Sequence, residues 1–474
     1  MSACVLERPS ATDSAFGVHC TLADERSAHA PRPALVVAVL GFFIVTLDTL
    51  VVNVALPSIG SDLGGGITGL QWVVDGYTLM FAALVLSAGA LSDRIGARQA
   101  FGVGLTTFVA ASVACGLAPE MGILIAARLA QGAGAAVMLP ASLALIREAY
   151  SNARQRARAI AIWSLGAAVA SSAGPVVGGF LTLLSWRMIF FINLPVGLVA
   201  LYLLTRVRRS PRRPAPFDWV GQTTAIVGMG ALTYGLIEGG TEGFRAPSVV
   251  GALVLAVGAL VTFLLAEQRG AHPMVPLELF HSRPVAVSVS VGFAFTIGFY
   301  GLVFLLSLYL QEVRGLSPLM TGLAFVPMTG LTGFVTLVAP RAAARFGPRV
   351  PVALGQVLNA VGLLSLTIAV ALQAPILLIA ILTIPVGFGS ALAIPTITAL
   401  LLGSVPAERA GTASGVLNTC RQIGGALAVA VFGILIAHRE TFVQGMQSSL
   451  LIAAVLLLVT AAASLQLDER GSHE

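Results

Sequence analysis

The sequence of 474 residues has no lysine, only four cysteines and few charged residues of any kind. Charged side chains make up 10% of the chain, whereas soluble domains carry about 25%. Together with 57% hydrophobic residues, this scarcity excludes an ordinary soluble domain, a disordered chain and a collagen-like repeat. We therefore expect an integral membrane protein.

The sequence also lacks the signatures of metal, disulfide and hydrolytic chemistry. Cys4 and Cys20 lie in a polar N-terminal segment and Cys115 and Cys420 in apolar runs, so we interpret all four as unpaired and inert. The six histidines lie in tails, in loops or at helix ends, without a second ligand at helical spacing. No P-loop, GxSxG or HExxH motif occurs, so we expect no metal, no cofactor and no ATP-driven or hydrolytic step.

Apolar runs of about 20 residues, long enough to cross a hydrocarbon core about 30 Å thick, recur throughout the chain. Polar or Pro/Gly breaks separate fourteen of them, so we predict an all-α membrane protein with fourteen spanning helices between two polar tails, 1–33 and 467–474. The predicted spans are 35–57, 70–91, 99–118, 121–147, 157–183, 188–206, 218–237, 247–266, 285–309, 319–341, 350–371, 375–402, 411–437 and 447–466.

All 27 basic residues are arginine, which is typical of GC-rich coding and favours a bacterial source. With the N-terminal tail placed inside, 21 of them fall in tails and inner loops, and the outer loops hold only Arg187, Arg245, Arg314 and Arg439. Arginine concentrates on the cytoplasmic side of membrane proteins. We therefore predict a bacterial cytoplasmic (inner) membrane protein with both termini cytoplasmic, and we attribute the net charge of +6 to this orientation and not to nucleic-acid binding.

A spacing motif, G-x-G-x5-P, occurs twice at an offset of 255 residues, and the starts of the predicted helices recur at about the same offset. The two copies consist of Gly132, Gly134 and Pro140, and of Gly387, Gly389 and Pro395. We predict a six-helix half at 34–206, a two-helix insertion with its linkers at 207–284, and a second half at 285–466. Repeated six-helix halves are a transporter architecture, with the substrate site between them near the middle of the bilayer.

Only Asp48, Arg128 and Arg421 are charged residues deep within the predicted spans. Such residues cost at least ~2.5–3.5 kcal/mol to insert and are functional candidates by default. At 1.5 Å per residue, Asp48 and Arg128 lie at a similar depth, so we expect them to meet. Asp48 is interpreted as a proton-binding residue whose proton affinity Arg128 tunes. The alternative is a static ion pair that fixes the first helix against the fourth.

The predicted substrate cavity includes Asn53, Gln131 and Arg421. Arg421 lacks an acidic partner in the sequence, so it either contacts an anionic group or extends along a cavity. Asn53 falls on a different helix face from Asp48, so it is either a substrate contact or a packing hydrogen bond. Asp75 and Glu238 lie near the predicted outer surface, where solvated interfacial acids are the simpler interpretation.

Two further segments suggest moving parts. In GALSDRIGAR (89–98), Gly89 and Gly96 allow a tight inner turn, and Asp93 either pairs with an arginine to close an inner gate or is a solvated loop charge. Ala344 stands at the corresponding position of the second half, so this gate is one-sided. In AGPVVGG (173–179), small residues let helices touch and Pro175 invites a bend, which fits either a rocking contact or ordinary tight packing.

Seven segments, in order along the chain, resemble motifs of the fourteen-helix drug:proton antiporters of the major facilitator superfamily. They are LDTLVVNVALP, GALSDRIGAR, RLAQGAG, AGPVVGG, WRMIFFINLPVG, YLQEVRGLSPLMTG and AGTASGVLNTCRQIGG. The resemblance implies a twelve-helix core with two extra central helices and alternating access. It implies proton coupling by Asp48 and Arg128, an inner gate of Asp93, Arg94 and Arg98, and an antiport hinge of Gly174, Pro175, Gly178 and Gly179. The absence of a deep acid in helices 9 to 14 counts against more than one titrating site.

We therefore predict a secondary active transporter, not an enzyme, that exports hydrophobic or amphipathic drugs or antibiotics in exchange for protons. Its expected partners are a small-molecule substrate, protons and the lipid bilayer, and it is expected to work as a monomer. The alternative is an exporter dedicated to one endogenous metabolite, such as a self-made antibiotic, an amino acid or a siderophore.

Overall fold

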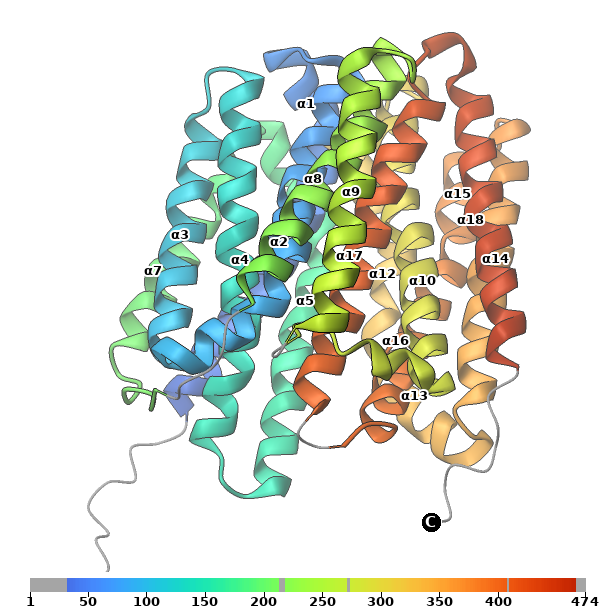
Figure 1. The fold of residues 1–474 in the computed structure, drawn as a ribbon. Helices are drawn as coiled ribbons and strands as arrows, with labels where there is room; N and C mark the ends of the chain where they lie inside the picture. Colours follow the sequence, from blue (N-terminus) through green and yellow to red (C-terminus); the bar gives the residue numbers. More distant parts are fainter. Residues whose placement is uncertain (1–31, 213–217, 271–272, 407–408, 466–474) are drawn as a thin grey trace, which may run out of the picture.

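The computed structural model describes residues 32–212, 218–270, 273–406 and 409–465, so the two predicted tails lie almost entirely outside the described residues. The described residues form a single bundle of helices without any strand (Figure 1). The helices are α1 (Arg32–Leu63), α2 (Gly66–Ile95), α3 (Ala97–Leu117), α4 (Met121–Ala149), α5 (Ala153–Leu184), α6 (Met188–Phe191), α7 (Asn193–Leu204), α8 (Trp219–Glu242), α9 (Pro247–Arg269), η1 (Leu277–His281), α10 (Arg283–Leu308), η2 (Tyr309–Val313), α11 (Pro318–Ala324), α12 (Val326–Gly330), α13 (Thr332–Phe346), α14 (Arg349–Ala371), α15 (Ile376–Leu382), α16 (Ile384–Gly403), α17 (Ala410–Leu435), η4 (Arg439–Thr441) and α18 (Phe442–Ser464).

Twelve helices of the described chain are long and apolar enough to cross a membrane, and the bent segment Pro318–Phe346 makes a thirteenth if it counts as one span. The predicted span 188–206 is the shorter apolar helix Met188–Leu204. The predicted number of fourteen is therefore reached only when this short helix and the bent segment are both included. Prolines explain the interruptions: α12 and α16 each carry one in their first two positions, and a proline has no N–H for a preceding turn.

The sequence repeat corresponds to a repeat in packing. In α4, Gly132 leaves no room for a Cβ against the backbone of Tyr77 in α2, and Gly134 leaves none against Gly104 in α3. In α16, Gly387 packs in the same way against Met328 in α12, and Gly389 packs against Gly355 in α14. Each glycine pair thus brings its helix into backbone contact with two neighbours. The exact boundaries of the two halves and the insertion stay predictions.

The helices before α8 and those after α9 contact each other unevenly along the bundle. We call the end where α1 begins and α18 ends the near end, drawn at the bottom of Figure 1, and the opposite end the far end. Most of the hydrogen bonds found between the helices before α8 and the described residues after α9 lie at mid-height or toward the far end, and one, from Ser87 of α2 to Sδ of Met274 (3.5 Å), lies toward the near end. The others join Gln71 to the carbonyls of Val429 and Ala430, Ser307 to Asn53, Gln311 to Val54, Ser172 to Thr329, and Thr419 to Ala82.

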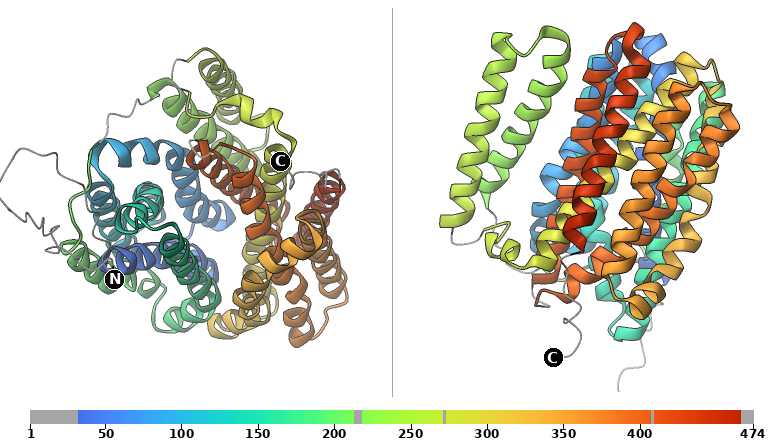
Figure 2. Two further views of the ribbon diagram at one scale, coloured as in Figure 1. Left: turned by 90° about the horizontal axis from the view of Figure 1, so that it is seen from below. Right: turned by 90° about the vertical axis from the view of Figure 1, so that its right-hand side faces the viewer.

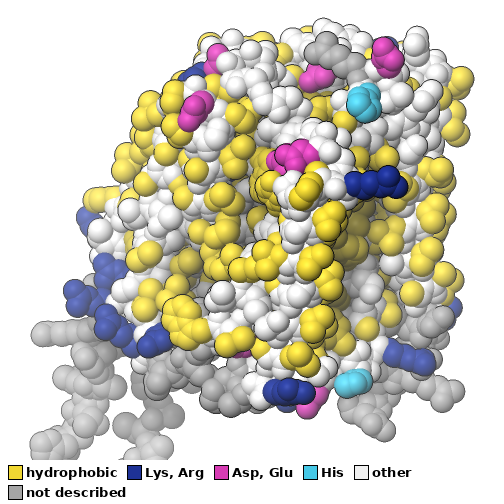
Figure 3. Space-filling model, turned by 45° about the horizontal axis from the view of Figure 1, so that its top comes forward, with side chains coloured by type: hydrophobic (Ala, Val, Ile, Leu, Met, Phe, Trp, Pro, Cys, Tyr) yellow, Lys and Arg dark blue, Asp and Glu magenta, His cyan; other side chains and the backbone are white. Residues whose placement is uncertain are grey.

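Helices α8 and α9 form a hairpin at the edge of the bundle (Figure 2, right). Glu238 of α8 accepts a hydrogen bond from the Trp72 indole of α2 (3.0 Å), and Gln222 of α8 donates to the carbonyl of Ala83 (2.9 Å). Helix α9 exposes a run of large apolar side chains, including Val254 and Val257. Figure 3 shows similar hydrophobic side chains over one face of the bundle, which is the surface expected for contact with lipid.

Candidate functional site

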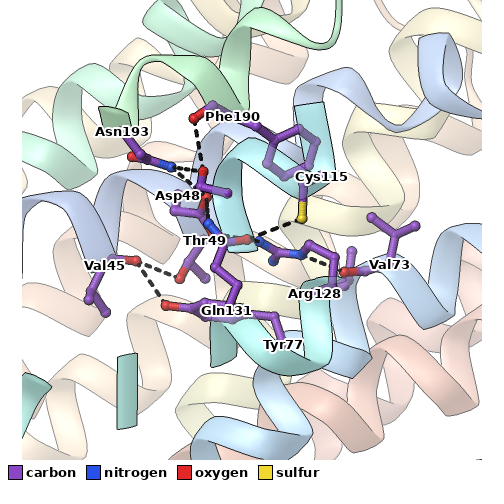
Figure 4. Close-up of polar contacts among 12 residues, drawn as sticks. Val45, Asp48, Thr49, Val73, Tyr77, Cys115, Arg128, Gln131, Phe190 and Asn193 are labelled. Carbon is purple, nitrogen blue, oxygen red and sulfur yellow. Dashed lines mark hydrogen bonds and ion pairs between the residues drawn. The ribbon is translucent and has the colours of Figure 1, made fainter. Parts of the chain in front are cut away.

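A buried polar network centred on Asp48 lies among α1, α4 and α7 (Figure 4). The carboxylate of Asp48 is 0% exposed and pairs through Oδ2 with Nη1 of Arg128 at 2.5 Å. Its other oxygen, Oδ1, accepts hydrogen bonds from Nε2 of Gln131 (2.8 Å) and Nδ2 of Asn193 (2.9 Å). The predicted meeting of Asp48 and Arg128 therefore occurs, and both charges are removed from solvent.

Arg128 is buried, with only 1% of its surface exposed, and polar and aromatic groups surround its guanidinium. Its Nε donates to the carbonyl of Val73 in α2 (3.0 Å), and its guanidinium lies 4.4 Å from the ring centre of Tyr77 and 5.8 Å from that of Phe190. Because Gly132 has no side chain, α4 packs directly against α2 at Tyr77 and brings the arginine to these partners. A buried guanidinium needs such compensation, because an unpaired one would cost several kcal/mol.

Three polar residues of this network were not recognised in the sequence. Asn193 bonds Asp48 and also donates to Oγ of Ser112 (3.0 Å), which in turn donates to the carbonyl of Phe190 (2.8 Å). The Sγ atom of Cys115, a residue interpreted as inert, lies 3.6 Å from Oε1 of Gln131. The signal available for Asn193 was a lone amide within the apolar segment WRMIFFINLPVG.

A small cavity lies between the two halves, on the other side of α1, with room for about one water molecule. Asn53 lines it, and its amide donates to the carbonyl of Thr49 (2.9 Å), so its role as a substrate contact stays a prediction. The prediction that Gln131 lines a substrate cavity is wrong, because its amide is 0% exposed and engaged with Asp48 and Arg128. The residues that line the cavity are Thr49, Asn53, Val74, Thr78, Tyr300, Gln422, Gly425 and Val429.

Arg421 of α17 directly precedes Gln422 of the cavity wall but is not itself part of that wall. Among the described residues it makes no hydrogen bond or ion pair, and its Nε is buried without a partner. Its side-chain stem passes Gly292 of α10, where a Cβ would lie 3.1 Å from Cγ of Arg421. The structure therefore retains a half-buried cation beside the cavity, in keeping with the absence of an acidic partner in the sequence.

The predicted inner-gate residues do not form a closed gate in this conformation. Helix α2 continues through Gly89 to Ile95, so the predicted turn is confined to Gly96, whose φ of 94° favours glycine. Gly89 therefore has no turn to form, and this part of the prediction is wrong. Asp93 is exposed and has no ion pair or hydrogen bond to any described residue.

The two arginines assigned to the gate differ in their surroundings. Arg94 is exposed at the near end. Arg98 donates through Nε to the carbonyl of Leu204 (3.1 Å), and its backbone N–H donates to Oγ of Ser210 (2.9 Å). These contacts hold the start of α3 against the end of α7 within one half, so Arg98 does not bridge the two halves here.

The predicted hinge residues lie where α5 passes between α1 and α11. Gly174 and Gly178 face α1, where a Cβ would lie 2.9 Å from Leu50 and from Val51 respectively. On its other side, Gly179 lies against α11, where a Cβ would be 2.8 Å from Cα of Leu319. A Cβ at Gly322 of α11 would meet the backbone carbonyl of Pro175 even more closely. This glycine-rich segment thus brings three helix backbones from both halves into contact near the far end.

The two acids interpreted as interfacial have different environments. Glu238 is partly exposed and accepts the hydrogen bond from Trp72, which fits that interpretation. Asp75 does not fit it, because its carboxyl group is 0% exposed and neither oxygen has a hydrogen-bond partner. The interpretation of Asp75 as a solvated acid is therefore wrong. The position of Asp75 along its helix predicted its depth in the membrane but could not show which neighbouring helices cover it.

Within the described part of the chain, no group of three or more histidine, cysteine, aspartate or glutamate residues is arranged to hold a metal ion. The polar groups brought together instead are one ion pair, its amide donors and a nearby cavity with uncharged hydrogen-bonding groups. This set can bind and release a proton and can contact a small molecule, but it presents no activated nucleophile beside a base.

Comparison with known proteins gives concordant matches. The family model described as Major Facilitator Superfamily matches residues 38–429. Multidrug resistance protein Stp of Mycobacterium tuberculosis (strain CDC 1551 / Oshkosh) is 38% identical over 406 residues, covering 85% of this chain and 75% of that protein. Methylenomycin A resistance protein of Streptomyces coelicolor is 35% identical over 436 residues, covering 91% of each chain. A crystal structure of a POT family transporter in complex with 5-aminolevulinic acid has the same fold, with a TM-score of 0.69, 12% identity and coverage of 94% of this chain and 96% of that one.

Proposed function

This chain belongs to the Major Facilitator Superfamily, and we propose that it exports hydrophobic or amphipathic drugs or antibiotics in exchange for protons. It is a multi-pass membrane protein with about twelve spanning helices. Support for drug export comes from its relatives, which include proteins named for multidrug resistance and for resistance to methylenomycin A. On this proposal it is a secondary active transporter, not an enzyme, and works as a monomer without a cofactor.

The observation that carries proton coupling is the buried position of Asp48 and its bond to Arg128. Protonation of Asp48 would remove the negative charge that compensates a buried guanidinium, so the network must rearrange when the proton binds. Both Asp48 and the cavity residues Thr49 and Asn53 belong to α1, and the Asn53 carbonyl also accepts a hydrogen bond from Ser307 of the other half (2.7 Å). A shift of α1 would therefore reach the cavity and the contact between the halves together.

The orientation follows from the arginines. The predicted inner loops, which hold most of the arginines, lie at the near end, and Figure 3 shows arginine side chains gathered along the lower edge of the visible face. We assign the near end to the cytoplasm of a bacterium by the positive-inside rule. The hydrogen bonds between halves then close the outer side, and the unpaired Asp93 belongs to an open inner gate, so this conformation faces inward.

The proposed exchange cycle alternates between this conformation and one that opens outward. The cavity has room for about one water molecule in this conformation, so it must widen as substrate enters from the near end and contacts Asn53, Tyr300 and Gln422. Substrate binding there favours release of the Asp48 proton inside. After the halves rock about the contact at Gly179, a proton from outside neutralises Asp48 and substrate leaves. Arg421, beside the cavity without a partner, is proposed to contact an anionic or carbonyl group of the substrate.

The test is drug export from a bacterial host lacking its own pumps. The full chain is expressed and scored against a panel of unrelated antibiotics and for efflux of the dye ethidium, with and without a protonophore. We expect reduced susceptibility and efflux that stops when the protonophore collapses the proton gradient. Asp48→Asn should abolish both, and thermal unfolding of the purified variant separates loss of coupling from loss of fold, because the substitution leaves Arg128 without its carboxylate. Glu120→Gln, which alters an exposed acid without a side-chain cap hydrogen bond, serves as the matched control. Full proton-driven efflux by Asp48→Asn refutes the coupling role.

The same panel separates broad export from the dedicated exporter. One relative is named for resistance to a single antibiotic, which keeps the second function in consideration. Protection against several unrelated compounds supports the multidrug exporter. Protection against one compound alone supports the dedicated exporter, and protection against none contradicts drug export.

A further inference from the structure

Asp75 of α2 is a buried carboxyl group that the proposed cycle does not use. It is 0% exposed, and both of its oxygens are buried without a hydrogen-bond partner. The described residues hold no other carboxylate with both oxygens in this condition. Protein atoms bury it rather than lipid, because the exposed fraction reflects contact with this chain alone.

The register of α2 places Asp75 at a junction of three helices. Gln71 donates to the carbonyls of Val429 and Ala430 in α17, and the carbonyl of Ala82 accepts a bond from α17, so this face of α2 lies against the other half. At 100° per residue, Asp75 lies 40° from Gln71, on the side of Trp72, which bonds α8. Asp75 is therefore covered where α2 meets both α17 and the hairpin helix α8.

No positive charge compensates Asp75 in this position. On the helices packed around α2, Asp48 and Arg128 are paired with each other, and Glu238 accepts a bond from Trp72. Other ionisable groups on these helices include Tyr77 on α2, Tyr234 on α8, whose ring centre lies 6.4 Å from that of Trp72, Cys420 and Arg421 on α17, and Tyr300 across the cavity. Of the described residues, none lies within ion-pair or hydrogen-bond distance of the Asp75 carboxyl.

An isolated carboxylate in such a site would pay a large desolvation penalty, and buried groups avoid it by taking up a proton. We propose that Asp75 is a second proton-binding site, protonated while α2, α8 and α17 are packed together and able to ionise only when the contact between α2 and α17 opens. This deepens the proposed exchange of drug for protons and rests on it. Because Asp75 ionises only when the far end is open, it does not deliver a proton to the near end. It acts instead as a proton-dependent switch of conformation at the boundary between the moving halves, separate from the network of Asp48.

The sign of the pH effect follows from this difference between conformations. The packed conformation holds the Asp75 proton more tightly than the open one, so low pH favours packing of the far end. Above the pH at which Asp75 ionises in the open conformation, the ratio of open to packed molecules rises by up to about tenfold per pH unit. On this proposal the chain has two titrating sites, whereas the sequence counted against more than one.

The first experiment detects the proton directly. Infrared spectra of the purified full chain and of Asp75→Asn are subtracted at neutral pH, where a protonated carboxyl gives a carbonyl band that an ionised carboxylate lacks. We expect this band in the unmodified protein and its loss in Asp75→Asn, with Glu238→Gln as the matched control that retains it. Asp75→Ala replaces Asp75→Asn if the latter does not fold. Absence of the band overturns the proposal.

The second experiment measures the conformational effect. Gln71→Cys and Gly433→Cys are introduced into a chain whose four native cysteines are alanine; a Cβ at Gly433 would lie 2.8 Å from Cγ of Gln71, within disulfide reach. With a fixed dose of an added thiol oxidant, the cross-link yield relative to that of the same chain carrying Asp75→Asn should fall as pH rises, because the faster oxidation of thiolates at high pH affects both chains alike. Identical pH profiles with and without Asp75 overturn the proposal. Neither experiment uses a transported drug, so failure of export and failure of this site are distinguishable.

Discussion

Asp48 and Thr49 are neighbours in α1 but belong to different environments. The Asp48 carboxylate is enclosed within one half, where it bonds Arg128, whereas Thr49 lines the cavity between the halves. A helix turns by 100° per residue, so adjacent side chains point to different neighbours while their backbones move as one rigid element. In the proposed mechanism, proton binding and substrate binding are thus coupled through one helix, without direct contact between the carboxylate and the cavity.

Removing the arginine should destabilise the fold more than removing both charges. Arg128→Met leaves Asp48 as a buried carboxylate without its cation, and we expect a loss of about 3–5 kcal/mol. In the double variant Asp48→Asn/Arg128→Met neither charge remains, so part of this loss should be recovered. Thermal unfolding of the purified proteins in detergent measures both effects. Equal destabilisation in the single and double variants would contradict the ion-pair explanation.

Adding one methyl group at the contact between α5 and α11 should impair transport. In Gly179→Ala the new Cβ would meet the backbone of Pro318 and Leu319, so the two helices must separate and the inward-facing packing becomes less stable. We expect proton-driven ethidium efflux to fall at least several-fold. Gly251→Ala in α9, where a Cβ meets nothing within 4 Å, is the matched control and should keep full efflux. Normal efflux by Gly179→Ala would show that the contact between α5 and α11 is not required for transport.

Asp93 should matter for transport but not for stability of this conformation. Because it is exposed and unpaired here, Asp93→Asn should change the unfolding free energy by less than about 0.5 kcal/mol. Efflux should nevertheless fall, since the proposed gate uses its charge only when the near end closes. Asp93→Glu keeps the charge and should restore most of the efflux. A variant with unchanged efflux and unchanged stability would identify Asp93 as a solvated loop charge.

Changes in the cavity wall should alter which drugs are exported. Tyr300→Phe removes one hydroxyl and Gln422→Ala removes one amide. The host should therefore lose protection against compounds that hydrogen-bond to these groups and keep protection against the others. The measurement is the relative susceptibility across the antibiotic panel, with Tyr234→Phe on the exposed side of α8 as the control. A uniform loss for all compounds would indicate a structural role in place of substrate contact.

The amino-acid sequence by itself determined the membrane-spanning character, the order of the helices and the depth of each charged residue. These features follow from local quantities, because apolar length and a fixed rise per residue suffice to place a side chain within a bilayer. The meeting of Asp48 with Arg128 was predictable for this reason. The paired glycine motifs in α4 and α16 were readable as well, since close backbone contact requires glycine at the same spacing in both halves.

Only the tertiary structure decided which neighbour each side chain faces. Gln131 lies one turn from Arg128, and nothing in the local pattern distinguishes a cavity from the interior of one half. Asn193 completes the network from more than 60 residues away. Asp75 is buried by α8 and α17, which come together from distant parts of the chain. Helical periodicity fixes the relative directions of side chains on one helix, but the helix that lies against each face depends on how all the helices pack.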